Sequence, residues 1–121
     1  MKLIQAETVE KEYRIGDITI NAIRGVDFAI DTASFVSFVG PSGSGKTTLL
    51  NMIGCLDRPT DGHLTILDTD VSGLNSRRAA AFRGENIGFV FQDFNLIPVL
   101  TAYENIEYPL VMVQQWSKEK R

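Results

Sequence analysis

The sequence is short of the residues that mark several classes of protein. It has a single cysteine, Cys55, among 121 residues, so no disulfide can form within the chain. Acidic residues outnumber basic ones, 15 to 12, and no basic stripe appears, which argues against a nucleic-acid-binding surface. No apolar run approaches the length of a membrane span, and residues 1–7 lack the apolar core of a signal peptide. We therefore expect a cytoplasmic protein.

The most informative pattern lies between residues 35 and 56. Residues 35–39 (F-V-S-F-V) are a short apolar run that predicts a buried strand. Residues 40–47 (G-P-S-G-S-G-K-T) match G-x-x-x-x-G-K-[ST], the phosphate-binding loop, for which an ordinary glycine-rich turn is the alternative. Residues 48–56 are apolar on most sides and predict a buried helix. A strand, a glycine-rich loop and a helix in this order are the context that the motif requires.

The chemistry of a triphosphate explains the residue types in this loop. Gly40, Gly43 and Gly45 permit backbone conformations that turn successive N–H groups inward, toward a bound anion. Lys46 supplies a positive charge for the β- and γ-phosphates, and the Thr47 hydroxyl is a hard oxygen ligand for Mg²⁺. The predicted phosphate-contacting residues are Gly40, Pro41, Ser42, Gly43, Ser44, Gly45, Lys46, Thr47 and Thr48.

The segments before this loop alternate between apolar and polar residues, as half-buried strands do. We expect strands at 3–9, 18–23 and 26–30, joined by turns at 16–17 and 24–25. They predict an antiparallel sheet that leads into the loop.

The residues that follow the predicted helix at 48–56 are expected to form a strand and then a second helix. Turn residues at 57–62 and 68–70 flank an expected strand at 63–67, and Asn75 or Ser76 caps a helix that runs to Arg83.

A further strand is expected at 86–91, followed by a partly exposed loop at 93–100 that Pro98 breaks. Residues 101–104 have the spacing of a capping box and open a helix that Pro109 can interrupt.

These motifs together resemble the ATP-binding subunit of an ABC transporter, within the subfamily that serves lipoprotein release and macrolide export. The resemblance covers nearly the whole chain. Its residues are 40–51, 53–60, the run I-G-F-V-F-Q at 87–92, and the segments 94–98 and 101–105 that follow it.

The resemblance implies an α/β fold. This is a P-loop NTPase core with an N-terminal antiparallel β-subdomain, from which the later core strands and most of the helical subdomain are missing. Residues 1–121 would form the N-terminal part of one ABC-type ATP-binding domain. Its β-subdomain would cover about 1–34, the phosphate loop and helix 35–57, the connecting strands and helix 58–91, and the glutamine loop with the start of the helical subdomain 92–121.

The resemblance also implies roles for single residues, with ATP and Mg²⁺ as the bound groups. Tyr13 matches the aromatic residue that stacks on adenine; the alternative is a half-buried aromatic that covers the sheet edge. Gln92 matches the glutamine that contacts Mg²⁺ and the attacking water, although it could be an ordinary polar residue at a strand end. The catalytic residues would be Lys46 and Gln92, and the metal ligands Thr47 and Gln92.

The implied function is to energise transport across, or extraction from, a membrane. An integral membrane permease would dock near residues 93–105, and the ATPase subunit would form a homodimer with a second copy of itself in the complete protein. The protein would then sit on the inner face of the cell membrane, bound through the permease. No nucleic-acid partner is expected.

Two departures from the family pattern qualify this interpretation. Ala33 stands where the family usually has glycine, so that turn must differ or carry strain. The signature L-S-G-G-Q, the strand that ends in Asp-Glu and the switch histidine are absent. We therefore expect the chain to be the N-terminal portion of a longer ATPase. A nucleotide-binding fragment without turnover and a different P-loop enzyme are the alternatives.

Overall fold

The computed structural model describes all residues, 1–121, and divides them into two compact units. The first unit comprises residues 1–80 and the second residues 81–121. None of the helices has the length and apolar character that a membrane span requires.

A long β-hairpin forms the base of the first unit. Strand β1 (Lys2–Ile15) and strand β2 (Ile18–Asp31) pair antiparallel, and the predicted turn at 16–17 joins them, with Gly16 at φ 62°. The predicted turn at 24–25 is wrong, because β2 runs through it. Between the pairs Val9↔Val26 and Lys11↔Ile23, two steps on β1 face three on β2, so Gly25 (φ 66°) lies in a β-bulge.

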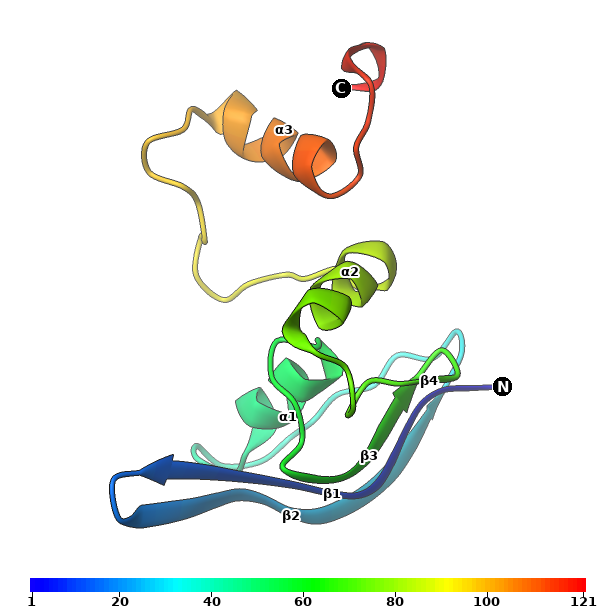
Figure 1. Cartoon of the computed structure of the whole chain (residues 1–121), viewed down its shortest axis with the longest axis vertical. Helices are drawn as coiled ribbons and strands as arrows, with labels where there is room; N and C mark the ends of the chain where they lie inside the picture. The colour runs from blue at the N-terminus through cyan, green and yellow to red at the C-terminus, as the bar shows by residue number, and fades with distance from the viewer. The chain divides into compact units, whose positions relative to one another are not determined.

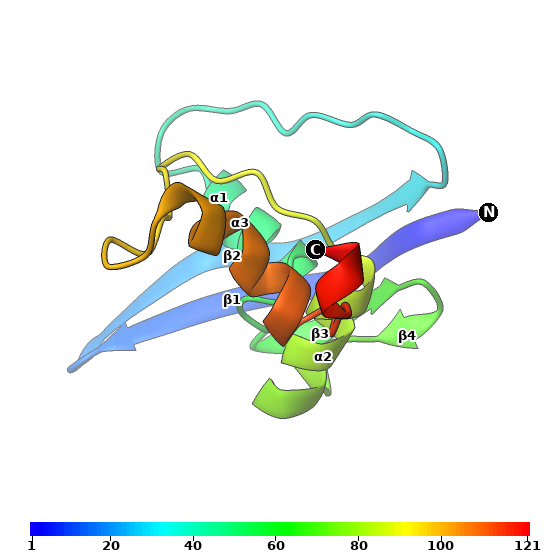
Figure 2. The ribbon, with the colours of Figure 1, turned by 90° about the horizontal axis from the view of Figure 1, so that it is seen from above.

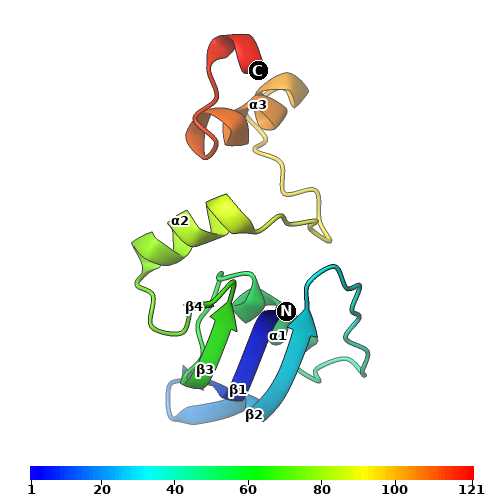
Figure 3. The ribbon, with the colours of Figure 1, turned by 90° about the vertical axis from the view of Figure 1, so that its right-hand side faces the viewer.

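Two further strands complete the sheet in the order β2-β1-β3-β4 (Figures 1 and 3). Strand β3 (Asp61–Ile66) pairs antiparallel with β1, and the short β4 (Thr69–Asp70) pairs with β3. The strand predicted at 63–67 therefore exists but begins two residues earlier, and the turn after it falls at 67–68.

The core lies between one face of this sheet and helix α1 (Lys46–Ile53). Side chains two residues apart on a strand share a face, which is how the strands contribute alternate residues to the core. The buried apolar residues include Ile4, Ala6, Val9 and Ile23 from the hairpin, Leu64 and Ile66 from β3, and Leu49 and Met52 from α1. The predicted helix at 48–56 is confirmed in its first part, but it ends at Ile53 with Gly54 as its C-cap, and Cys55 is buried in the turn after it.

The strand predicted at 35–39 is absent. These residues form part of an extended arch between β2 and α1, which Figure 2 shows leaving the sheet. A strand needs a neighbour to pair its N–H and C=O groups, and no other segment of the chain pairs with this one. Phe35 and Val39 are consequently 98% and 92% exposed. Phe38 makes one ring contact, edge-on to Phe28 with centroids 5.8 Å apart.

Helix α2 (Ser76–Asn86) ends at the first residue of another predicted strand. Asn75 caps it, because its side-chain oxygen accepts a hydrogen bond from the Arg78 N–H at 2.9 Å. The helix continues three residues beyond the expected end at Arg83. The strand predicted at 86–91 is wrong for the same reason as the strand at 35–39: no other segment of the chain pairs with it.

In the second unit, an extended segment at 87–100 leads to helix α3 (Ala102–Met112). The predicted capping box is confirmed: Thr101 Oγ1 accepts from the Glu104 N–H, and Glu104 Oε2 accepts from the Thr101 N–H at 2.7 Å. Pro109 does not interrupt the helix, which ends with the Val113 N–H donating to the Pro109 carbonyl. A short 3₁₀ turn, η1 (Lys118–Lys120), follows.

Candidate functional site

The glycine-rich loop ends at Gly45, the N-cap of α1, with φ at 92°. No side chain caps this helix, so the first N–H groups of α1 have no partner within the chain. They carry the positive end of the helix dipole. Gly43 also has a positive φ, 78°, which bends the chain just before the helix. The arrangement leaves several N–H donors free for an anion.

Lys46 places its ammonium group inside the loop. Its Nζ donates to the carbonyls of Gly40 and Pro41, both at 2.7 Å, and to Ser44 Oγ at 3.2 Å. No acidic side chain forms a salt bridge with Lys46. A full positive charge held only by neutral oxygens is suited to a negatively charged ligand.

A hollow of about 390 Å³ opens between this loop and β2. It contains most of the residues predicted to contact phosphate, and no carboxylate lines it. The lining residues are Ile20, Asn21, Ala22, Ser42, Gly43, Gly45, Lys46, Thr47 and Thr48. The lining is therefore suited to an anion, and the Thr47 hydroxyl adds an oxygen of the kind that Mg²⁺ binds.

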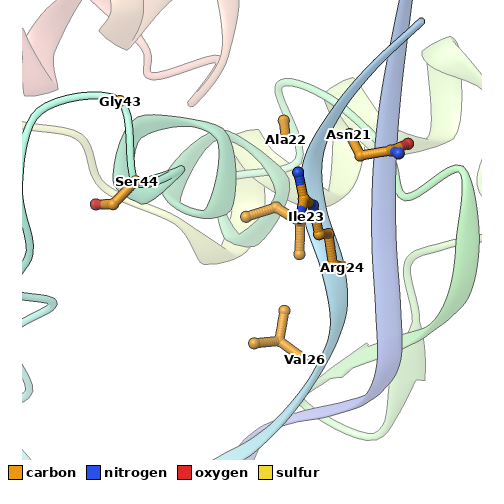
Figure 4. Close-up of a pocket in the computed structure, with 7 residues that line it drawn as sticks. All are labelled: Asn21, Ala22, Ile23, Arg24, Val26, Gly43 and Ser44. Atoms are coloured by element: carbon orange, nitrogen blue, oxygen red, sulfur yellow. The ribbon is translucent and has the colours of Figure 1, made fainter.

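A second hollow of about 350 Å³ adjoins the first along β2 (Figure 4). Ile23 and Val26 point from β2 toward the side formed by Gly43 and Ser44. Arg24 is the one charged residue that lines it. The contribution of β2 to both hollows was not predicted, because strand alternation shows which residues share a face but not which loop lies opposite.

Glycine is required at the contact between loop and strand. A Cβ on Gly45 would lie 2.8 Å from the Ala22 carbonyl oxygen and 2.7 Å from Ile23 Cδ1, both well inside normal contact. Gly43 has open space around its Cα. Gly40 has no positive φ, contrary to expectation, and its added Cβ would meet only Ser44, with Oγ at 2.8 Å. The three glycines therefore serve different purposes.

Tyr13 lies within β1, which continues past the strand predicted at 3–9, and is 36% exposed. Its hydroxyl donates to Asp57 Oδ2 at 2.8 Å, and Lys11 donates to Asp57 Oδ1 at 2.7 Å. Burial raises the pKa of the Tyr13 phenol, and the hydrogen bond and negative charge of Asp57 raise it further, against a smaller effect of a hydrogen bond with Thr48. The phenol therefore stays neutral and its hydroxyl remains a donor at neutral pH.

Lys11 and Asp57 were not predicted as parts of the site. Asp57 belongs to a run of turn residues, and only the fold brings it to a residue 44 positions away. The pKa of Asp57 is lowered: burial alone would raise it, but hydrogen bonds from Lys11, Tyr13 and the Arg58 N–H, with the charge of Lys11, outweigh burial.

Gln92 lies in the second unit, in the extended segment before α3, and is exposed. Its predicted roles in catalysis and in Mg²⁺ binding, together with Thr47, stay predictions.

The fold and the loop place the chain in the P-loop class of nucleotide-binding proteins. The family described as ABC transporter matches residues 23–121. The chain belongs to this family, as its sequence indicated.

The relatives of the chain are named as ATP-binding proteins of ABC transporters or of macrolide export. An uncharacterized ABC transporter ATP-binding protein of Thermotoga maritima is 45% identical over 120 residues, which cover 99% of this chain and 51% of that protein. The macrolide export ATP-binding/permease protein MacB of Syntrophobacter fumaroxidans is 47% identical over 110 residues, covering 91% of this chain and 15% of that protein.

A solved structure supports the fold. It is a dimeric post-hydrolysis state of the ATP-binding cassette MJ0796, from Methanocaldococcus jannaschii, bound to ADP and Pi. It superposes with a TM-score of 0.89 at 44% identity, over 97% of this chain and 51% of that chain. The chain thus spans about half the length of the cassette proteins that it matches.

Proposed function

We propose that this chain is part of the ATP-binding subunit of an ABC transporter, which binds and hydrolyses MgATP to drive transport across, or extraction from, a membrane. The observation that carries the proposal is the Lys46 ammonium group, held by carbonyls at a helix N-terminus whose N–H groups have no partners. The names of its relatives and the ADP and Pi bound to MJ0796 support the same function.

The proposed site assigns one task to each part of the loop. The backbone N–H groups of residues 40–48 other than Pro41, which has none, bind the phosphates. Lys46 exchanges its carbonyl partners for the β- and γ-phosphate oxygens. Thr47 and Gln92 would hold Mg²⁺, which supplies positive charge to the phosphate oxygens when it is bound. Tyr13 would stack on adenine, a contact worth about 1–3 kcal/mol in comparable sites.

The proposed partners are a permease and a second ATPase subunit. In the segment proposed to meet the permease, residues 93–105, Phe94 and Val99 are 93% and 89% exposed, which fits a surface that a partner covers. The dimeric MJ0796 structures support assembly with a second copy. Such a complex would hold the protein at the inner face of the cell membrane.

A nucleotide-binding role without turnover is the second candidate. No carboxylate lines the hollow beside the phosphate loop, so none there could orient the attacking water. Binding by this chain is therefore better supported than hydrolysis by this chain alone.

Calorimetric titration of the intact protein with MgATP tests the proposal. Lys46→Ala should abolish measurable binding, because it removes the charge built into the loop. Lys2→Ala is the matched control, since it removes the same charge from an exposed position on β1. Unchanged affinity in Lys46→Ala would refute the phosphate-loop assignment.

A further inference from the structure

A cluster of three side chains connects β1 to the turn after α1. Lys11 and Tyr13 are two residues apart on β1 and therefore project from the same face of the strand. Both bind the Asp57 carboxylate, one at each oxygen, at 2.7 and 2.8 Å. Lys11 Nζ also donates to the Arg58 carbonyl at 2.9 Å and lies 4.9 Å from the centre of the Tyr13 ring.

This cluster differs from an ordinary surface ion pair. Lys11 is the one buried charged residue of the chain, and the Asp57 side chain is 29% exposed. Because both carboxylate oxygens are engaged, Asp57 is held in one orientation, and it holds the Tyr13 hydroxyl in turn. The Tyr13 ring is therefore fixed at two ends, by its own backbone in β1 and by its hydroxyl.

The ring also lies next to the hollow beside the phosphate loop. Tyr13 pairs across the hairpin with Ile20, and Ile20 lines the hollow together with Lys46, Thr47 and Thr48 at the start of α1. A planar group attached to a triphosphate in the loop would therefore find the ring within reach of that end of α1.

We propose that Asp57 is a positioning residue for nucleobase binding: it anchors the Tyr13 hydroxyl and so holds the aromatic ring in the orientation in which the base stacks. The inference rests on the proposed binding of a nucleoside triphosphate and on the stacking role of Tyr13. A ring that is already immobilised loses less conformational freedom when a base stacks on it. Releasing one side chain should weaken binding by about 2- to 10-fold.

The competing explanation is purely structural. The Lys11–Asp57 ion pair joins β1 to the turn after α1, so its loss could disturb the phosphate loop through α1. That explanation predicts weaker binding of any phosphate ligand, whereas positioning of the ring concerns only ligands that carry a base.

Calorimetry on the intact protein, with MgATP and with inorganic tripolyphosphate plus Mg²⁺, separates the two explanations. Asp57→Ala and Tyr13→Phe should each weaken ATP binding by about 2- to 10-fold and leave tripolyphosphate binding unchanged. The double variant should be no weaker than either single variant, and Asp57→Ala should have no effect in a Tyr13→Ala background. Asp70→Ala, which removes an exposed carboxylate paired with His63, is the control and should change neither affinity.

Several results would overturn the proposal. These are an equal loss of affinity for both ligands in Asp57→Ala, additive losses in the double variant, or equal affinities of the wild type for ATP and tripolyphosphate. Failure of the wild type to bind either ligand would instead refute the proposed function. If Asp57→Ala does not fold, Asp57→Asn provides the same test with a smaller expected loss, since it keeps the volume of the side chain and one acceptor oxygen.

Discussion

Gly45→Ala should damage the phosphate loop far more than Gly43→Ala, although both residues are glycines of one motif with a positive φ. The φ values are 92° and 78°, so an alanine at either position costs roughly 1–2 kcal/mol of backbone strain. The two sites differ in what a Cβ would meet. At Gly43 there is nothing within 4 Å, so strain is the whole cost.

At Gly45 the new methyl group would lie 2.8 Å from the Ala22 carbonyl oxygen. The Ile23 methyl group, at 2.7 Å, can rotate away, but the Ala22 oxygen belongs to the backbone of β2 and cannot. Relief requires α1 and the loop to move away from β2. Overpacking of this kind costs about 1–3 kcal/mol, so Gly45→Ala should lose about 2–5 kcal/mol in total.

Urea unfolding of the intact protein, followed by far-UV circular dichroism, gives the stability difference, and calorimetry gives the affinity for MgATP. Gly45→Ala should lose both stability and affinity, and Gly43→Ala should lose about 1–2 kcal/mol of stability. Equal losses of stability in the two variants would refute the argument, because the close contact between Gly45 and β2 would then contribute nothing to the free energy of unfolding.

Three further predictions follow from other parts of the structure. Ala33 has a φ of 58°, so Ala33→Gly should relieve strain and raise stability by up to about 1 kcal/mol, whereas Ala29→Gly in β2 should lower it by about 0.5–1 kcal/mol; urea titration of both compares them. Folding lowers the pKa of Asp57 from its ordinary value of 3.8. The ionised carboxylate therefore makes its full contribution to the free energy of unfolding above pH 3.8, and this contribution is lost as the pH falls through the lower pKa of the folded state. Asp57→Asn should therefore flatten the pH dependence of unfolding below about pH 4. If it leaves that dependence unchanged, the cluster does not bind the charged carboxylate. Residues 1–121 alone should neither hydrolyse ATP at a useful rate nor unfold as one cooperative unit. Phosphate release, together with coincident near-UV and far-UV melting of a monomer, would show the opposite.

Local interactions explain the features that the sequence predicted correctly. The turn at 16–17, the caps at Asn75 and Thr101 and the glycine-rich loop each depend on residues within a few positions of one another. The chemical character of a short segment is enough to specify them. The family could also be identified from the sequence, because these segments occur in a fixed order.

The two predicted strands at 35–39 and 86–91 show where local pattern fails. Both runs have the composition of buried strands, yet a strand forms only where another segment supplies partners for its N–H and C=O groups. Of the segments in this chain, only β1, β2, β3 and β4 pair with one another. The composition of a segment indicates that it favours the strand conformation, but a strand forms only if another segment hydrogen-bonds with its backbone.

The sequence by itself determined the phosphate loop and the position of its lysine, and its resemblance to the family singled out Tyr13 as the predicted stacking residue. From the sequence alone, Tyr13→Phe is expected to be neutral, because the ring is kept. Only the tertiary structure placed Asp57 against the Tyr13 hydroxyl and the Ala22 carbonyl against Gly45. These contacts join residues far apart in the chain, and no local pattern encodes the distance between them.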